Sequence, residues 1–166
     1  MTASVFQFPT VPASDLPRLY RTAADIIETR GWTSGRSVGP NNERCAGAAI
    51  NEAAGRHLRD VSPDIMGPFA LWLVTHRREQ VMVAFEHQGF TFPPEVGGRL
   101  ERLVSGNFAG EDMAAMTVIQ RWNDDDGTRV GASFSLSVSV GSPLRSKDEV
   151  VAALRECAAS LDGSVT

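Results

Sequence analysis

Strict alternation between apolar and small polar residues, over about 129–140, restricts the possible folds more than any other segment of this 166-residue chain. Glycine or serine separates the apolar members, which are Val130, Ala132, Phe134, Leu136, Val138 and Val140. A period of two is the pattern of a half-buried β-strand. We therefore expect one long strand here. Because a lone strand leaves its backbone groups unpaired, it must join a small sheet or a dimer interface.

Most of the remaining chain has the three- and four-residue apolar spacing of amphipathic helices. The first expected helix covers 14–30 and ends before Gly31, and the second covers 43–58 after a cap at Asn41 or Asn42. Helical structure is expected again over 62–88, with a break at Gly67-Pro68, and then over Arg99–Val104 and 111–122. A last helix begins with a capping box formed by Ser146 and Glu149. The predicted class is α+β, predominantly helical with one long strand. A single domain over 14–162 follows an extended arm over 1–13.

Composition and charge limit the classes of function. Hydrophobic residues make up 42% of the chain and charged residues 22%, which is typical of a globular domain. The net charge of −4 makes nucleic acid an unlikely partner. The longest apolar run, Phe69–Val74, is too short for a membrane span, and the first residues lack the features of a secretory signal. We expect a cytoplasmic protein with no membrane association and with Cys45 and Cys157 as thiols.

The stretch RWNDDDG, residues 121–127, raises the possibility of a metal site. An EF-hand loop with Gly127 at its sixth position would place Trp122 and Ser133 where acidic ligands are required, so that motif fails. Adjacent side chains also point in different directions. We expect a helix end followed by an Asp-Gly turn, with Asn123 and Asp124 bonded to local backbone groups and Trp122 in the core.

The same survey predicts no metal site and no cofactor. Three histidines, His57, His76 and His87, are widely spaced, and no pair of histidines or cysteines has the spacing of a zinc site. No phosphate-binding glycine loop is present either.

Cys45 is the strongest candidate for a catalytic residue. Near the first turn of a helix, unpaired N–H groups favour a thiolate. A cysteine nucleophile would take one of the three histidines, such as His57 or His87, as its base and Asn123 or Asp124 as the orienting group. The alternative is a small buried residue in a tightly packed, alanine-rich helix.

The densest basic segment is THRRE, which contains Arg77 and Arg78. Together with Arg99 and Arg102 it could form a patch that binds phosphate or acidic groups. The alternative is an ordinary solvated helix surface.

Four segments, taken in order, resemble a small domain family of unknown function from actinobacteria and their phages. They are RTAADIIETRGW, CAGAAINEAAG, QRWNDDDG and KDEVVAALRECA. The resemblance marks five signature positions, which are Trp32, Cys45, Trp122, Asn123 and Asp124, and it implies no catalytic residues. Residues 59–110 and the expected strand are additions to the family pattern.

These observations leave three hypotheses for function. The first is a non-catalytic accessory or binding protein that acts through a protein partner or through self-assembly, for example as a homodimer joined by residues 129–140. The second is an enzyme that uses Cys45 as its nucleophile. The third is a small-molecule or nucleotide-binding protein, supported only by scattered arginines. The sequence does not decide whether the protein is an enzyme, and we favour the non-catalytic hypothesis.

Overall fold

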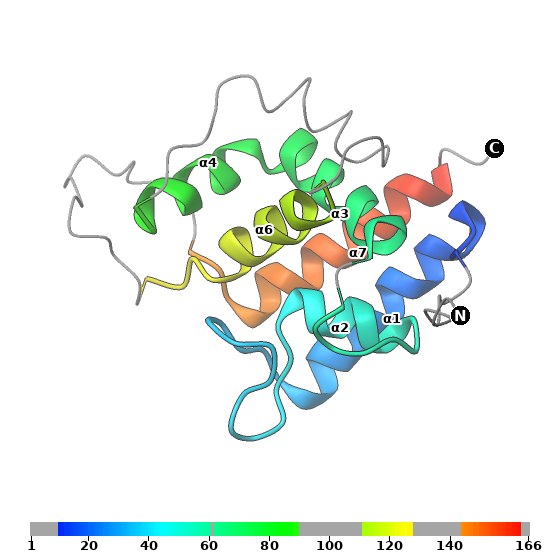
Figure 1. Ribbon diagram of the computed structural model, residues 1–166, viewed down its shortest axis with the longest axis horizontal. Helices are drawn as coiled ribbons and strands as arrows, with labels where there is room; N and C mark the ends of the chain where they lie inside the picture. The colour runs from blue at the N-terminus through cyan, green and yellow to red at the C-terminus, as the bar shows by residue number, and fades with distance from the viewer. Residues whose placement is uncertain (1–9, 61, 90–110, 128–143, 164–166) are drawn as a thin grey trace, which may run out of the picture.

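The computed structural model describes residues 10–60, 62–89, 111–127 and 144–163. Helices account for most of these residues (Figure 1). In chain order they are the short 3-10 helix η1 (Ala13–Asp15), α1 (Leu16–Arg30), α2 (Ala46–Ala53), α3 (Pro63–His76), α4 (Arg78–His87), α6 (Glu111–Asn123) and α7 (Lys147–Gly163).

The prediction of an α+β fold is wrong, because the described residues form helices and no strand. Their only β-type pairing is two isolated bridges, in which Trp32 and Val38 each pair with Arg44. The alternating residues 129–140 lie outside the described residues, as do Arg99–Val104 and most of the expected N-terminal arm.

Helices α1 and α7 run side by side and make the most extensive helix contact (Figure 1). Each contributes the apolar stripe expected from its sequence, with Ile27 of α1 and Leu154 of α7 fully buried. Burial of such a side chain stabilises a fold by roughly 1.5–3 kcal/mol. The predicted end of α1 is confirmed: Gly31 adopts a φ of 100°, and its N–H donates to the Ile27 carbonyl at 2.8 Å.

Helix α3 continues through Gly67 and Pro68, where a break was expected. A proline inside a helix removes one backbone hydrogen bond and normally kinks or ends the helix. Here the residues on both sides, including Met66 and Phe69, are fully buried in one core. Tertiary burial therefore outweighs the local preference. α4 begins after one intervening residue, Arg77.

Three aromatic side chains join α1, α3 and α6 at the centre of the core. Phe69 lies 5.7 Å from Tyr20 and 6.0 Å from Trp122, measured between ring centroids. The Tyr20 hydroxyl donates to the Ile65 carbonyl at 2.7 Å, so its polar end is also satisfied. Trp122 is fully buried, which confirms its predicted place in the core.

None of the helices in the described ranges has the length and apolarity needed to span a bilayer.

Candidate functional site

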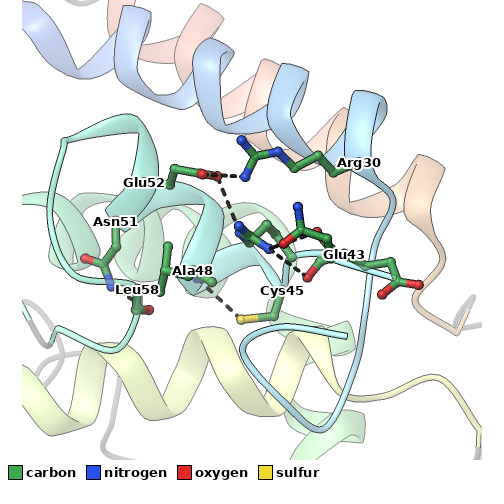
Figure 2. A network of polar contacts seen from close by, with 9 residues as sticks. Arg30, Glu43, Cys45, Ala48, Asn51, Glu52 and Leu58 are labelled. Atoms are coloured by element: carbon green, nitrogen blue, oxygen red, sulfur yellow. Dashed lines mark hydrogen bonds and ion pairs between the residues drawn. The ribbon is translucent and has the colours of Figure 1, made fainter. Parts of the chain in front are cut away.

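Helix α2 begins at Cys45, whose side chain caps it. The Cys45 Sγ accepts a hydrogen bond from the Ala48 N–H at 3.3 Å, and Figure 2 shows the thiol turned toward this first turn. The predicted caps, Asn41 and Asn42, instead belong to the preceding turn, where Asn42 has a φ of 67°. The helix is also shorter than expected, because the chain leaves it at Gly55 with a φ of 69°.

A group of charged side chains fixes the loop that leads into α2 (Figure 2). The buried guanidinium of Arg44 donates to the Asn42 carbonyl at 2.8 Å, and its Nε lies 3.4 Å from the Glu52 carboxylate. Glu52 also pairs with Arg30 at the end of α1. These contacts hold the loop against α1 and α2 just before Cys45.

Asn123, the last residue of α6, joins three parts of the chain. Its Oδ1 accepts from the Trp32 indole N–H at 2.8 Å and from the Ala46 backbone N–H at 3.0 Å. Its Nδ2 donates to the Thr33 carbonyl at 3.1 Å and to the Asp124 carboxylate at 2.9 Å. We call this set of contacts the Asn123 junction. It holds the 31–35 loop and the start of α2 against the end of α6.

The three consecutive aspartates point to three different sets of partners. Asp124 accepts from the Gly35 N–H at 2.8 Å, and Asp126 accepts from the Ser34 hydroxyl. Asp125 is buried and meets His87 Nδ1 at 2.7 Å. The predicted turn is confirmed, with a φ of 87° at Gly127, but the prediction that Asn123 and Asp124 bond mainly to local backbone is wrong. Across the described ranges, no group of three or more Asp, Glu, His or Cys side chains is placed to hold a metal.

Arg145 completes the surroundings of Asp125. Its backbone N–H donates to the Asp125 carbonyl at 2.7 Å, and its Nε donates to the Trp122 carbonyl at 3.1 Å. The guanidinium lies 5.3 Å from the Trp122 ring centroid, and its Nη2 is 3.5 Å from the Asp125 carboxylate. Burial lowers the pKa of Arg145, and the charge of Asp125 opposes that shift. The contacts tie the segment before α7 to the end of α6.

A hollow of about 430 Å³ opens beside Cys45. Its walls come from the 35–37 loop, the start of α2, the segment after α2 and the end of α6, and they include Arg36, Cys45, Arg59, Arg121, Asn123 and Asp124. We call it the larger hollow. A second space of about 170 Å³, the smaller hollow, adjoins it, because Ser37, Cys45, Arg59 and Gln120 belong to the walls of both.

Helices α2 and α6 approach closely between the two hollows. Gly47 lines the larger hollow and Met116 lines the smaller one. A Cβ atom added at Gly47 would lie 3.1 Å from the Met116 Sδ. The absence of a side chain at position 47 therefore sets the spacing between the two helices.

Of the predicted catalytic residues, the structure brings Cys45 and Asp124 to the same hollow and places the histidines elsewhere. The walls of both hollows contain no histidine among the residues described. His57 accepts from the Arg59 N–H, the His76 ring packs 5.2 Å from that of Trp72, and His87 is bonded to Asp125.

The chemistry of the Cys45 thiol is set by its burial, since only 8% of the residue is exposed. Burial raises the pKa of the thiol; the Ala48 N–H opposes this rise, and the Asp124 charge adds to it. The thiol is therefore protonated at neutral pH, which is unlike an activated nucleophile.

The two described arginines of the predicted patch have different surroundings. Arg77 pairs with Glu156 and lies 5.1 Å over the Trp72 ring, whereas Arg78 is exposed on α4. Arg99 and Arg102 lie outside the described residues.

Sequence reasoning missed the arginines at the larger hollow, Arg36, Arg59 and Arg121. They come from three separate segments, so no local spacing could have indicated that they share a site.

The chain belongs to the family of unknown function DUF6197, whose model matches residues 12–160. This confirms the expected membership of an uncharacterised family. No curated protein and no solved structure matches the chain.

Proposed function

We propose that this member of DUF6197 is a non-catalytic binding protein that holds a small anionic ligand in the larger hollow. One observation carries the proposal: among the described residues, three arginines and one acidic residue line a hollow of about 430 Å³ in a chain of net charge −4. Sites for small molecules have volumes of roughly 300–1,000 Å³. Guanidinium groups suit phosphate and carboxylate because their N–H donors match the geometry of these oxyanions.

Arg36 and Arg59 supply the donors. Both are exposed, and neither side chain makes a hydrogen bond or ion pair with another described residue. Arg121 has a different role, because its Nη1 donates to Gln88 Oε1 at 3.2 Å. Arg121 belongs to the wall of the hollow, and this bond holds its side chain against Gln88.

The walls are fixed by contacts already present. The Asn123 junction and the bond from the Gly35 N–H to Asp124 hold the loop that carries Arg36. A site whose frame is ordered in advance loses less conformational entropy when a ligand binds. These polar contacts favour a binding site over an incidental gap between loops.

A binding role is favoured over cysteine-dependent catalysis for two reasons. The raised pKa keeps the Cys45 thiol protonated, and the capping bond commits its sulfur to Ala48. Slow alkylation of Cys45 by iodoacetamide in the native protein at pH 7 is the expected result. Rapid alkylation with a depressed pKa would support the enzyme hypothesis instead.

The test of ligand binding compares two double variants with the same change of charge. Arg36→Ala/Arg59→Ala removes the proposed donors, and Arg18→Ala/Arg78→Ala removes two exposed arginines elsewhere. Titration calorimetry with inorganic phosphate and with citrate should show at least a tenfold loss of affinity for the first variant only. An equal loss in both variants, or no binding of either anion by the wild type, would contradict the proposal.

The hypothesis of a homodimer depends on residues 129–140, which lie outside the described residues. Sedimentation analysis of the full chain, with and without the anion, measures the oligomeric state directly.

A further inference from the structure

We propose that the anion bound in the larger hollow carries a short alkyl chain, and that this chain occupies the smaller hollow. The proposal rests on the function proposed above and specifies the ligand as a small oxyanion, phosphate or carboxylate, with an aliphatic substituent.

The two hollows differ in the character of their walls. Three arginines are among the residues that line the larger one, whereas Ala48, Leu58 and Met116 contribute apolar surface to the smaller one. Ala48 and Met116 are buried and form part of the framework between α2 and α6. An oxyanion without a substituent would leave this apolar surface unused.

Arg59 and Cys45 lie where the hollows adjoin, since both residues line each of them. An oxyanion bound by the Arg59 guanidinium therefore has its substituent at the entrance to the smaller hollow. The aliphatic stem of an arginine is itself compatible with apolar surface. The Cys45 sulfur is only a weak hydrogen-bonding group and suits a boundary between a polar and an apolar space.

The start of α2 does not replace the arginines as the site for the head group. The Ala46 N–H donates to Asn123 and the Ala48 N–H donates to Cys45. The Gly47 N–H in the same turn also interacts with the Cys45 thiol. With these donors engaged, the arginines are the main candidates to bind the head group. Among the described residues, neither hollow has an aromatic side chain in its walls. A nucleobase would find no ring to stack on, which favours an alkyl substituent.

Two series of compounds test the inference by calorimetry on the full chain. One series is inorganic, methyl, propyl and pentyl phosphate, and the other is acetate, butyrate and hexanoate. The series that binds identifies the head group. Within that series, affinity should rise roughly fourfold for each buried methylene group, because burial of one methylene is worth about 0.8 kcal/mol. The rise should stop once the smaller hollow is full.

A polar substitution in the smaller hollow distinguishes binding of the alkyl chain from binding of the head group. Leu58→Asn keeps a similar side-chain size and should flatten the increase with chain length while leaving the affinity for the shortest member within about twofold. Leu144→Asn, at an exposed leucine that lines neither hollow, is the matched control and should preserve the increase. Leu58→Ala serves as the second variant if the polar side chain impairs folding.

The outcomes distinguish this inference from the proposed function. If the short compounds bind but longer chains bind no more tightly, the alkyl inference is overturned and anion binding stands. If the increase persists unchanged in both Leu58 variants, the chain lies elsewhere and the inference is again overturned. If no compound of either series binds, both proposals fail.

Discussion

The contact between α1 and α7 and the Asn123 junction hold the chain together by opposite means. Between the helices, apolar side chains such as Ile27 and Leu154 are fully buried, and the charged pairs lie outside on the surface. At the junction, one amide side chain makes four hydrogen bonds, two of them to backbone groups of other segments. The first region depends on the amount of apolar surface that is buried, and the second depends on the matching of donors and acceptors.

This difference affects what each region tolerates. An apolar contact weakens gradually as side chains are shortened, because the free energy follows the area and volume lost. A buried donor or acceptor without a partner costs about 1–3 kcal/mol at once. The region that frames the larger hollow is therefore the less tolerant of the two. Four substitutions test this contrast by their effect on stability. One lies in each region, one removes a partly buried ion pair, and one removes exposed ion pairs.

Asn123→Ala should have the largest effect. It leaves the Ala46 N–H, the Trp32 indole N–H and the Thr33 carbonyl without their partner, and we expect a loss of about 4 kcal/mol in the free energy of unfolding. Urea unfolding followed by tryptophan fluorescence measures it. Asn41→Ala, at an exposed asparagine, is the control and should cost less than about 0.5 kcal/mol. A loss below about 1 kcal/mol for Asn123→Ala would show that the junction is dispensable.

Leu154→Ala should destabilise the helix contact by about 3 kcal/mol, since a fully buried leucine is replaced by a smaller side chain and a cavity. The same unfolding experiment applies, with Ala152→Ser on the exposed face of α7 as the control. If this loss exceeds that of Asn123→Ala, the order inferred for the two regions is incorrect.

Asp64→Asn tests a partly buried ion pair. Asp64 accepts from both terminal nitrogens of Arg56, at 2.6 and 2.8 Å, and from the Val11 N–H at 2.9 Å. Burial alone would raise the pKa of Asp64, but these contacts outweigh it and the pKa is lowered. We expect a loss of about 2 kcal/mol at pH 7, because hydrogen bonds to charged groups are among the stronger ones.

The pH dependence of that loss has a definite sign. A carboxyl with a lowered pKa in the folded state stabilises the fold above its unfolded pKa, which is about 3.9, and the stabilisation disappears as the pH falls through the folded value. The difference in unfolding free energy between wild type and Asp64→Asn should therefore be constant from pH 7 to about 5 and shrink below about 4. A difference that stays constant down to pH 2 would exclude this linkage.

Arg155→Ala should have the smallest effect. Arg155 pairs with Asp25 and Glu28 across the exposed edge of α1 and α7, where all three side chains are well solvated. Exposed pairs contribute little to stability and weaken with salt. Thermal unfolding in low salt and in 1 M salt should show a small difference that disappears at high salt. A difference that persists in 1 M salt would show that these ion pairs contribute substantially to the stability of the fold.

The apolar contact was largely predictable from the sequence. The stripes of α1 and α7, the stop at Gly31 and the cap at Ser146 follow from local spacing, and the bond from the Glu149 N–H to the Ser146 hydroxyl, at 3.3 Å, confirms the last of these. The local rules failed in two places. Tertiary burial in the core carries α3 through Pro68. At α2 the cap is a local bond to the Cys45 thiol and not to an asparagine.

The candidate site was predictable only in part. Cys45 and Asp124, two of the predicted catalytic residues, both line the larger hollow, and their predicted catalytic role stays a prediction. The contacts that hold the loop beside the larger hollow were not predictable. The hydrogen bond between Trp32 and Asn123 joins residues 91 positions apart, and no periodic pattern connects them. The same holds for Arg36, Arg59 and Arg121, which become neighbours of one hollow only after the helices have packed.

The close approach of Gly47 to Met116 couples the packing of α2 against α6 to the volume of the smaller hollow. Even one methyl group at position 47 would press on a thioether that lines the smaller hollow. Either the two helices would separate or the thioether would turn into the space beside it. Substitution at this position would thus alter the volume of the smaller hollow without changing any charged side chain, so the size of this space can be engineered independently of its charge.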